Sequence, residues 1–498
     1  MSVGKVWLVG AGPGESGLLT LKGYQVLQQA DVVVYDSLIG DGLLAMVPDQ
    51  AIAIHAGKRA GHHTMAQEEI NQLLLREAEA GHRVVRLKGG DPFLFGRGGE
   101  ELELLAQRGV PYEVVPGVTS ALAVPAYNGI PVTHRDFASS LHIVTGHRRA
   151  GEACPINFKA LVETEGTLVF LMGVASLPDI CRGLLEAGID PSMPAALLQK
   201  GTTAGQKRIV ASVATLEEEA KRRKIETPAI LVVGRVCQLA EDFAWYERLP
   251  LAGYKVLVTR PRDRSFALSE KLRILGAEVL ELPAIETVPI SDNPRLREAC
   301  ANLQQYQWIA FTSPTGVQVF FDQMRAYETD IRKLAHVKMA VIGEGTRNAL
   351  AQRGFFADLM PEVYEGAALG AALAAVCGRD ERILLPRAES GGREILDQLA
   401  DHLVDDIPTY RTRYRQQGLI DEARLFEEGD VDCAVFTSAS TVKGFVAATP
   451  GLDYSKVTAA CIGRRTKACA DSFGMKTYMA EKATTDSLAE LVINIHGC

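Results

Sequence analysis

The sequence lacks the features that mark a secreted, membrane-spanning or zinc-binding chain. Its nine cysteines stand singly along 498 residues with no Cys-x-x-Cys pair, and their odd number does not suggest a disulfide framework. No apolar run reaches the roughly 18 residues that a transmembrane helix needs. The opening MSVGKVWLVGAGPG has no cationic leader before an apolar stretch. We therefore expect a cytoplasmic protein with no metal site and no membrane attachment.

Positive charge is also scarce relative to negative charge. The chain has 53 Lys and Arg against 61 Asp and Glu, a formal net charge of −8. A general nucleic-acid surface is basic, so we expect no nucleic-acid partner, although a local basic pocket for an anionic ligand remains compatible with this balance. At 498 residues the chain exceeds what one core usually organises, which predicts about two to four folding units.

Strand-like runs alternate with helical stretches through the first half. KVWLVG, DVVVYD, RVVRLKG, TLVFLMG and AILVVG are separated by segments such as TMAQEEINQLLLREAEAG. This alternation predicts an α/β fold with mainly parallel sheets. Polar and aromatic residues followed by Pro250 and Gly253 lead into a new strand-like run, VLVTR, and predict a linker near 245–252. We therefore expect domains at 1–245 and 251–498.

The second half contains an internal repeat. VLVTRPR recurs as ILLPRAE, ELPAIET as DIPTYRT, AFTSPTGVQVF as VFTSASTVKGF, and AVIGEGTRNAL as ACIGRRTKACA, always in the same order. Phe311 and Phe436 are 125 residues apart (436 − 311), as are Pro283 and Pro408 (408 − 283). So long a period excludes a solenoid and predicts two similar α/β lobes with a cleft between them, lined by the FTS and IG-x-x-T loops.

The first Gly-rich turn, VGAGPGESGLLT, follows a predicted strand. Gly10, Gly12 and Gly14 form G-x-G-x-G, but the dinucleotide fingerprint needs a small residue where this chain has Glu15 or Ser16. No Walker lysine follows. From this turn alone, a structural connection and a ligand loop are equally well supported.

A second Gly-rich segment, RLKGGDPFLFGRGGEE, is more informative. Gly89 and Gly90 would allow a ligand to lie against bare backbone, with the Asp91 carboxylate beside it. The alternative is a tight turn in which Asp91 is only a cap. Glu100 and Glu101 at the start of the following helix could simply complement its N-terminus.

In combination these motifs resemble the tetrapyrrole methylase family, and within it uroporphyrinogen-III C-methyltransferases, over about residues 3–240. The segments are GAGPG, VYDSLI, GKRAGHH, RLKGGDPFLFGRGGEE, VPGVTSALAVPAYNGIPVTHRD, FLMG, KGTTAGQ and TPAILVVG. The resemblance implies two α/β lobes that bind S-adenosylmethionine (SAM) between them, a homodimer, and methylation of two pyrrole carbons of uroporphyrinogen III to give precorrin-2.

The resemblance also implies roles for individual residues. Asp36 of VYDSLI would be the base that removes a proton, and Lys58 of GKR the partner acid or a contact to a substrate carboxylate; without the motifs they would read as the end of a strand and a surface lysine. The implied SAM contacts are Pro13, Gly89, Gly90, Asp91, Leu94, Thr119, Ser120, Met172, Gly201 and Ala229.

The repeated half resembles uroporphyrinogen-III synthase over about residues 251–495. That family implies closure of hydroxymethylbilane to uroporphyrinogen III with inversion of ring D, and no cofactor. Tyr410 would be the hydrogen-bond donor to the departing hydroxyl, and Arg387 and Arg393 could hold substrate carboxylates. Each Ser or Thr can equally be a turn or helix cap. The candidate cleft hydroxyls are Thr312, Ser313, Ser438 and Thr466.

The main hypothesis is therefore a bifunctional enzyme of sirohaem or cobalamin synthesis that acts on small-molecule tetrapyrroles. One alternative is a methylase of a later corrin intermediate. Another is that the repeated half is a regulatory module that binds a tetrapyrrole without turning it over.

Overall fold

The computed structural model describes residues 3–57, 65–146, 156–260, 262–415 and 418–497. Its contacts group the chain into two compact units. Unit 1 comprises Met1–Leu282, Gln417–Ala439 and Thr449–Cys498, and unit 2 comprises Pro283–Gln416 and Ser440–Ala448. Each of four five-stranded sheets forms the centre of one lobe, with lobes 1, 2 and 3 in unit 1 and lobe 4 in unit 2. The fold class is α/β, as predicted.

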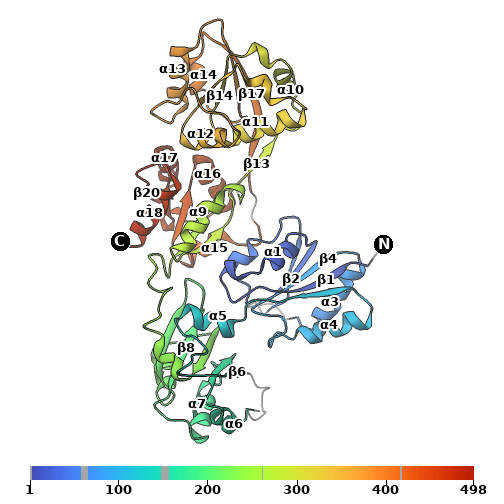
Figure 1. Ribbon diagram of the computed structural model, residues 1–498, viewed down its shortest axis with the longest axis vertical. Coiled ribbons are helices and arrows are strands. Elements are labelled where there is room, and N and C mark those ends of the chain that lie inside the picture. The colour runs from blue at the N-terminus through green and yellow to red at the C-terminus, as the bar shows by residue number, and fades with distance from the viewer. Residues whose placement is uncertain (1–2, 58–64, 147–155, 261, 416–417, 498) are drawn as a thin grey trace. The chain divides into compact units, whose positions relative to one another are not determined.

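Lobe 1 is a parallel sheet with the strand order β3-β2-β4-β1-β5 and helices on both faces (Figure 1). α3 buries Ile70, Leu73, Leu74 and Ala78, the spacing of one helix face, against one side of the sheet. α1 covers the other side. The elements are β1 (Lys5–Gly10), α1 (Leu21–Leu27), β2 (Val32–Tyr35), α2 (Asp41–Leu44), β3 (Ile52–His55), α3 (Gln67–Glu79), β4 (Arg83–Lys88), α4 (Gly98–Gln107) and β5 (Tyr112–Val115).

Lobe 2 has the strand order β6-β7-β10-β8-β9 and is mostly antiparallel. The prediction of mainly parallel pairing is right for lobe 1 and wrong here. The connection from β8 to β9 has only seven residues and no helix, and so short a connection favours antiparallel neighbours. The elements are α5 (Ser120–Tyr127), which packs in the core of this lobe, β6 (Leu141–Thr145), α6 (Phe158–Glu163), β7 (Thr167–Leu171), α7 (Leu177–Glu186), β8 (Pro194–Gln199), β9 (Lys207–Ser212), α8 (Leu216–Arg222) and β10 (Ala229–Val233).

Lobe 3 has the strand order β12-β11-β18-β19-β20, and all its neighbouring strands are parallel. Its strands come from two separate stretches of the chain, one before and one after lobe 4. The elements are β11 (Lys255–Val258), α9 (Arg262–Ile274), β12 (Glu278–Glu281), α15 (Glu422–Glu427), β18 (Cys433–Phe436), α16 (Ala439–Ala448), β19 (Thr458–Cys461), α17 (Arg464–Asp471), β20 (Lys476–Met479) and α18 (Thr485–His496). α16 begins in unit 1 and continues in unit 2.

Lobe 4 has the strand order β13-β17-β16-β14-β15, with only β13 antiparallel to its neighbour. The elements are β13 (Ile285–Pro289), α10 (Pro294–Ala301), β14 (Trp308–Phe311), α11 (Pro314–Ala326), β15 (Lys338–Val341), α12 (Glu344–Ala351), α13 (Gly366–Val376), β16 (Arg382–Ala388), α14 (Glu394–Gln398) and β17 (Leu403–Tyr414).

The sequence repeat is visible in the strand order. When the two copies of the repeat are aligned in sequence, β11 corresponds to β16, β14 to β18 and β15 to β19. In lobe 3 the order β12-β11-β18-β19 then matches β17-β16-β14-β15 in lobe 4. The two copies are interleaved, because each lobe takes its first strands from one copy and its later strands from the other. The repeat is therefore confirmed, but it does not divide the half into two consecutive lobes.

The predicted linker near 245–252 is packed against lobe 2. Tyr246 is buried, and its ring lies 5.0 Å from the ring of Tyr127, centroid to centroid. The indole nitrogen of Trp245 donates to the Ala126 carbonyl at 2.9 Å. Among the described residues, no helix has the length and apolar character to cross a membrane, and no group of three or more His, Cys, Asp or Glu side chains is placed to hold a metal ion.

Candidate functional site

The candidate residues of lobe 1 follow the carboxyl ends of parallel strands. Asp36 follows β2, Gly89 to Asp91 follow β4, Pro13 lies in the loop after β1, and Thr119 lies in the loop after β5. These four strands are consecutive neighbours in the sheet. Their carboxyl ends therefore meet at one edge, which is where open α/β sheets bind ligands. Lys58 lies outside the described residues.

Three loops at this edge are locked together through glycine. Gly12 and Gly90 form a two-way backbone bridge, with N to O distances of 3.2 and 2.8 Å, and both have positive φ. A Cβ on Gly10 would lie 2.5 Å from the Cα of Gly117, and a Cβ on Gly117 would lie 2.3 Å from the Gly90 carbonyl oxygen. These glycines are therefore required where the backbones of neighbouring loops touch.

Gly90 also has an open side. A Cβ built there would have Ser120 N, at 4.0 Å, as its nearest neighbour. Ser120 begins α5, and the Thr119 hydroxyl caps that helix by accepting from the Ala121 amide at 3.3 Å. The backbone beside Gly90 is thus an uncrowded ledge next to a helix N-terminus.

Asp91 has a structural role in addition to any ligand contact. Its Oδ1 accepts from the Phe93 amide at 2.9 Å, and its Oδ2 accepts from the Gly117 amide at 3.0 Å. The carboxylate thereby ties the loop after β4 to the loop after β5. Both interpretations offered by the sequence are compatible with this geometry, because each oxygen retains a further lone pair.

The lobe 2 candidates also lie at one edge of their sheet. Met172 follows β7, Gly201 follows β8, and Ala229 begins β10, which is antiparallel to both. Met172 is half-exposed and has φ +57°, a left-handed conformation that is rare for a residue with a side chain. Lys200 and Thr202, on either side of Gly201, also have positive φ. Such strained backbone clusters at binding sites.

The two edges are connected within unit 1. The Glu15 amide donates to the Thr202 hydroxyl at 3.2 Å, and the Tyr127 hydroxyl donates to Glu15 Oε2 at 2.6 Å. Burial, followed by this carboxylate, raises the pKa of Tyr127. Leu94, from the loop after β4, packs against the hydrophobic core of lobe 2. All ten predicted SAM contacts therefore lie on loops, at strand ends or, for Ser120, at the start of α5, at these two joined edges. The sequence did not point to Glu15, Tyr127 and Thr202, which join them.

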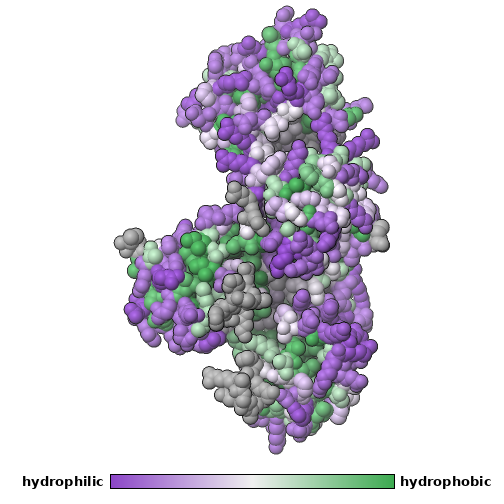
Figure 2. Space-filling view, turned by 180° about the vertical axis from the view of Figure 1, so that it is seen from behind, coloured by the Kyte–Doolittle hydropathy of each residue, from purple (hydrophilic) through white to green (hydrophobic). Residues whose placement is uncertain are grey.

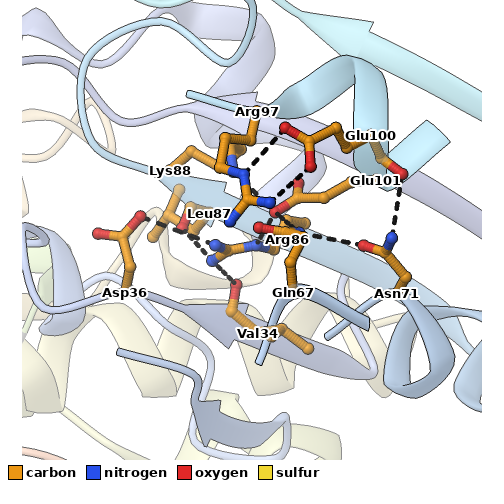
Figure 3. A network of polar contacts seen from close by, with 10 residues as sticks. All are labelled: Val34, Asp36, Gln67, Asn71, Arg86, Leu87, Lys88, Arg97, Glu100 and Glu101. Carbon is orange, nitrogen blue, oxygen red and sulfur yellow. Dashed lines mark hydrogen bonds and ion pairs between the residues drawn. The ribbon is translucent and has the colours of Figure 1, made fainter. Parts of the chain in front are cut away.

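Asp36 lies beside a buried network of charges (Figure 3). Its Oδ1 accepts from the Leu38 amide at 3.0 Å, and its Oδ2 lies 3.9 Å from the guanidinium of Arg86. Arg86 and Lys88 both donate to Oε1 of Glu101, at 3.1 and 2.7 Å. Burial lowers the pKa of Lys88, and the Arg86 charge lowers it further.

The network bears on one alternative that the sequence left open. Glu101 could simply have complemented the N-terminus of α4, but its side chain is also fully buried and paired with Arg86 and Lys88. Only Glu100 remains exposed, where it pairs with Arg97. The sequence pattern could not separate the two glutamates because they are adjacent in one helical turn.

In unit 2, the side chains of Tyr410 and Ser313 are joined by a hydrogen bond. Their hydroxyl oxygens are 2.8 Å apart, and Ser313 also caps α11 by accepting from the Gly316 amide at 2.9 Å. Thr312 precedes Ser313 at the end of β14. Tyr410 is only 6% exposed. The structure therefore places a tyrosine hydroxyl and two small hydroxyl residues at one sheet edge.

Arg387 does not fit its predicted role as a holder of substrate carboxylates. It is buried, it forms a two-pronged ion pair with Asp406 at 2.7 and 2.8 Å, and it donates to the Gly392 carbonyl. Its guanidinium is already used to anchor the loop after β16. Arg393 stands at the N-cap position of α14.

The remaining synthase candidates belong to unit 1. Ser438 follows β18 and Thr466 lies in the first turn of α17 after β19, and these strands are parallel neighbours. Thr466 is buried. The two residues thus share an edge of lobe 3, whereas Thr312 and Tyr410 belong to lobe 4 in the other unit.

Two family models match the chain. The model described as Tetrapyrrole (Corrin/Porphyrin) Methylases matches residues 5–217, and the model described as Uroporphyrinogen-III synthase HemD matches residues 267–490. The chain is 45% identical to the porphyrin biosynthesis protein HemD of Ruminiclostridium josui over 100% of its own length and 99% of that protein. It belongs to the family of tetrapyrrole methylases fused to a uroporphyrinogen-III synthase.

Other relatives resemble mainly the methylase half. The chain is 39% identical to uroporphyrinogen-III C-methyltransferase of Bacillus subtilis (strain 168), covering 71% of this chain and 73% of the relative. A solved structure, uroporphyrin-III C-methyl transferase from Thermus thermophilus complexed with S-adenyl homocysteine, is 40% identical and covers 47% of this chain and 94% of that chain, with a TM-score of 0.41. The first half of the chain is thus a tetrapyrrole methylase, and the second half is a uroporphyrinogen-III synthase.

Proposed function

We propose that the protein converts hydroxymethylbilane to uroporphyrinogen III with inversion of ring D, and then methylates two pyrrole carbons of that product to give precorrin-2. The observation that carries the methylase assignment is the ledge at Gly90, which is open on one side and locked to Gly12 on the other. The synthase assignment depends on the interleaved repeat and on the bonded pair of Tyr410 and Ser313.

In the methylase half, SAM supplies the methyl group when it is bound. Gly90 and Asp91 would hold it against the loop after β4, and Met172 and Ala229 would hold it from lobe 2. The pyrrole carbon that receives the methyl group becomes tetrahedral and the rest of the ring takes up the positive charge, so a proton must leave the substrate. Asp36, at the neighbouring strand end, is the proposed acceptor of that proton.

In the synthase half, Tyr410 is the proposed donor to the departing hydroxyl of hydroxymethylbilane. The carbon–oxygen bond breaks, and the hydroxyl leaves as water with the donated proton. The substituted α-carbon of ring D attacks the cation to form a spiro intermediate, the older bond of that carbon to ring C's bridge breaks, and ring D recloses inverted through its free α-carbon. The proton lost from that free α-carbon restores the donor hydroxyl. Ser313, which is bonded to the tyrosine hydroxyl, fixes its direction. The hydroxyl of Thr312 would contact the substrate beside Tyr410, and this half would need no cofactor. Ser438 and Thr466 are candidates at their own edge of lobe 3.

A coupled assay tests both steps. Purified protein given hydroxymethylbilane alone should yield the type III isomer, and addition of SAM should yield the dimethylated product. Chromatography of the oxidised porphyrins separates the isomers. If only the type I isomer accumulates, as it does by spontaneous closure, the synthase proposal is wrong. If uroporphyrinogen III is left unmethylated while a later corrin intermediate is methylated, the methylase substrate is wrong.

The Asp91→Ala variant tests the site on its own. We expect SAM binding to weaken markedly, because the loop after β4 loses its ties to Phe93 and Gly117, whereas the synthase rate persists. Titration calorimetry with S-adenosylhomocysteine measures the first effect and the isomer assay the second. Loss of both activities in parallel would mean that the two halves do not work independently.

We also propose that the protein forms a homodimer through its methylase half. On the face drawn in Figure 2, hydrophobic residues gather over lobe 1 amid a hydrophilic surface. The exposed apolar side chains of this lobe include Leu21, Leu38, Phe93 and Phe95. Light scattering coupled to gel filtration should give twice the chain mass of 53.9 kDa, and a monomer at micromolar concentration would contradict the proposal.

A further inference from the structure

Each nitrogen of the Arg86 guanidinium faces a different neighbouring group (Figure 3). Its Nε donates to Glu101 Oε1 at 3.1 Å, and its Nη1 donates to the carbonyls of Val34 and Leu87 at 3.4 and 3.2 Å. Its Nη2 lies 3.9 Å from Asp36 Oδ2. The side chain is 4% exposed. A planar group held at three points has one orientation, and that orientation presents Nη2 to Asp36.

Glu101 is the group that fixes Arg86. Its carboxylate is fully buried, and its Oε1 also accepts from Lys88 at 2.7 Å and from Gln67 at 3.3 Å. A buried carboxylate that has lost its water is stable only with such partners, so the arrangement resists rearrangement. Together, Arg86, Lys88, Glu101 and Asp36 carry two positive and two negative charges.

The contact with Asp36 is suited to orienting a base without blocking it. Oδ1 is already held by the Leu38 amide, and the attraction of Arg86 fixes the direction of Oδ2. At 3.9 Å the guanidinium is beyond hydrogen-bond distance, so the lone pairs of Oδ2 stay available to accept a proton. A shift of about 1 Å in a reacting group can cost roughly 10²-fold in rate, which makes such fixing valuable.

We propose that Arg86, held by Glu101, is a positioning residue that aligns the Asp36 carboxylate for proton removal. This inference depends on the proposed function, in which Asp36 is the base. Arg86 itself is buried beside Asp36 and acts through that carboxylate.

A double-mutant cycle tests the inference with the full-length protein. We expect Arg86→Gln to lower kcat for methylation of uroporphyrinogen III by roughly 10²-fold, with binding of S-adenosylhomocysteine unchanged. We expect Asp36→Asn to lower kcat by about 10² to 10⁴-fold. In the double variant, Arg86→Gln should add no further loss, because Arg86 acts through the carboxylate that is already gone.

A second variant covers the case in which Arg86→Gln does not fold. Arg86→Lys keeps the buried charge but lacks the planar fork that reaches both carboxylates, so it should restore the melting temperature and not kcat. The matched control is Arg83→Gln, which breaks a pair with Asp31 between the same two strands at the opposite end. That variant should methylate at the normal rate.

The outcomes separate the inference from the proposed function. If Arg86→Gln lowers kcat equally with and without Asp36, or if Arg86→Lys restores kcat fully, Arg86 does not position the base. If Asp36→Asn methylates normally, the assignment of Asp36 as the base fails instead. If the unmodified protein does not methylate uroporphyrinogen III, the proposed function fails.

Discussion

In the methylase half the candidate residues lie on loops that touch one another, whereas in the synthase half they are divided between two compact units. The methylase loops meet through backbone, as in the bridge between Gly12 and Gly90 and the approach of Gly117 to Gly10. The synthase candidates are hydroxyl side chains at the edges of two sheets, such as Tyr410 in lobe 4 and Thr466 in lobe 3.

This difference predicts different tolerance to substitution. A site built from main-chain contacts has no room for an added methyl group, because backbone cannot rotate away as a side chain can. A site built from several hydroxyls loses one hydrogen bond at a time, and each is worth about 1 kcal/mol. We therefore expect single changes to be severe in the first half and graded in the second.

The largest effect is expected for Gly117→Ala. Its Cβ would lie 2.3 Å from the Gly90 carbonyl oxygen and 2.6 Å from the Gly10 Cα, so two loops must separate. We expect destabilisation of about 1–3 kcal/mol and a loss of methylation of roughly 10²-fold or more. Thermal unfolding and the two enzyme assays measure these effects, and the synthase rate should be retained.

Gly99→Ala is the matched control for this change. An added Cβ there meets nothing within 4 Å, and the residue lies in the first turn of α4. Alanine is favoured over glycine in a helix by about 0.5–1 kcal/mol, so the variant should be as stable as the parent or slightly more. Equal loss of methylation in both variants would mean that loop contact does not explain the sensitivity of the site.

A smaller effect is expected for Tyr410→Phe. The change removes the hydroxyl that is bonded to Ser313 but leaves the ring in place. We expect the synthase rate to fall about tenfold, which corresponds to ~1.4 kcal/mol, while methylation of supplied uroporphyrinogen III is unchanged. The rate is measured as formation of the type III isomer.

Tyr306→Phe controls for the general loss of a tyrosine hydrogen bond in the same unit. The Tyr306 hydroxyl donates to Asp405 at 2.6 Å, and Tyr306 is not a site candidate. Its variant should keep the synthase rate even if stability falls. A fall of more than about 10³-fold in the synthase rate of Tyr410→Phe would show that this half depends on one residue. The expected difference from the methylase half would then be wrong.

The sequence could predict that the candidate residues share sheet edges, because most of them lie near strand ends. Gly89 to Asp91 and Asp36 each follow a run of apolar residues, and parallel strands bring such positions together at one edge. The repeat likewise predicted two similar lobes, and lobes 3 and 4 share the order of four strands. These features are encoded locally, in motifs and periodicity.

The features that the sequence did not predict depend on long-range packing. The interleaving of the two repeats is a matter of which lobe each strand joins, and the local pattern is the same in either arrangement. The pairing of Glu101 with Arg86 depends on α4 lying over β4, and the use of Arg387 to anchor a loop depends on the approach of Asp406. From the sequence alone, a charged residue near a motif is interpreted as a surface residue or as a ligand contact. Only the structure shows whether it is buried.

The smallest expected effect is on the pH dependence of stability, and it is tested with one ion pair in each unit. In lobe 1, the hydrogen bond from Arg83 lowers the pKa of Asp31 from 3.8 to about 2. In lobe 4, the hydrogen bond from Arg332 lowers the pKa of Asp330 from 3.8 to about 2. Arg83 is 52 residues from Asp31, whereas Arg332 is two residues from Asp330. The distant pair must break on unfolding, and the local pair can persist in the unfolded chain.

A carboxylate with a lowered pKa stabilises the fold above its unfolded pKa, and this stabilisation is lost as the pH falls towards the folded value. For Asp31 that window is about pH 4 to 2. Asp31→Asn should therefore make the melting temperature less sensitive to acid, whereas Asp330→Asn should leave its pH dependence nearly unchanged, as calorimetry between pH 5 and 2.5 would measure. Equal flattening by both variants would mean that the pair of Asp330 and Arg332 also forms only in the folded protein.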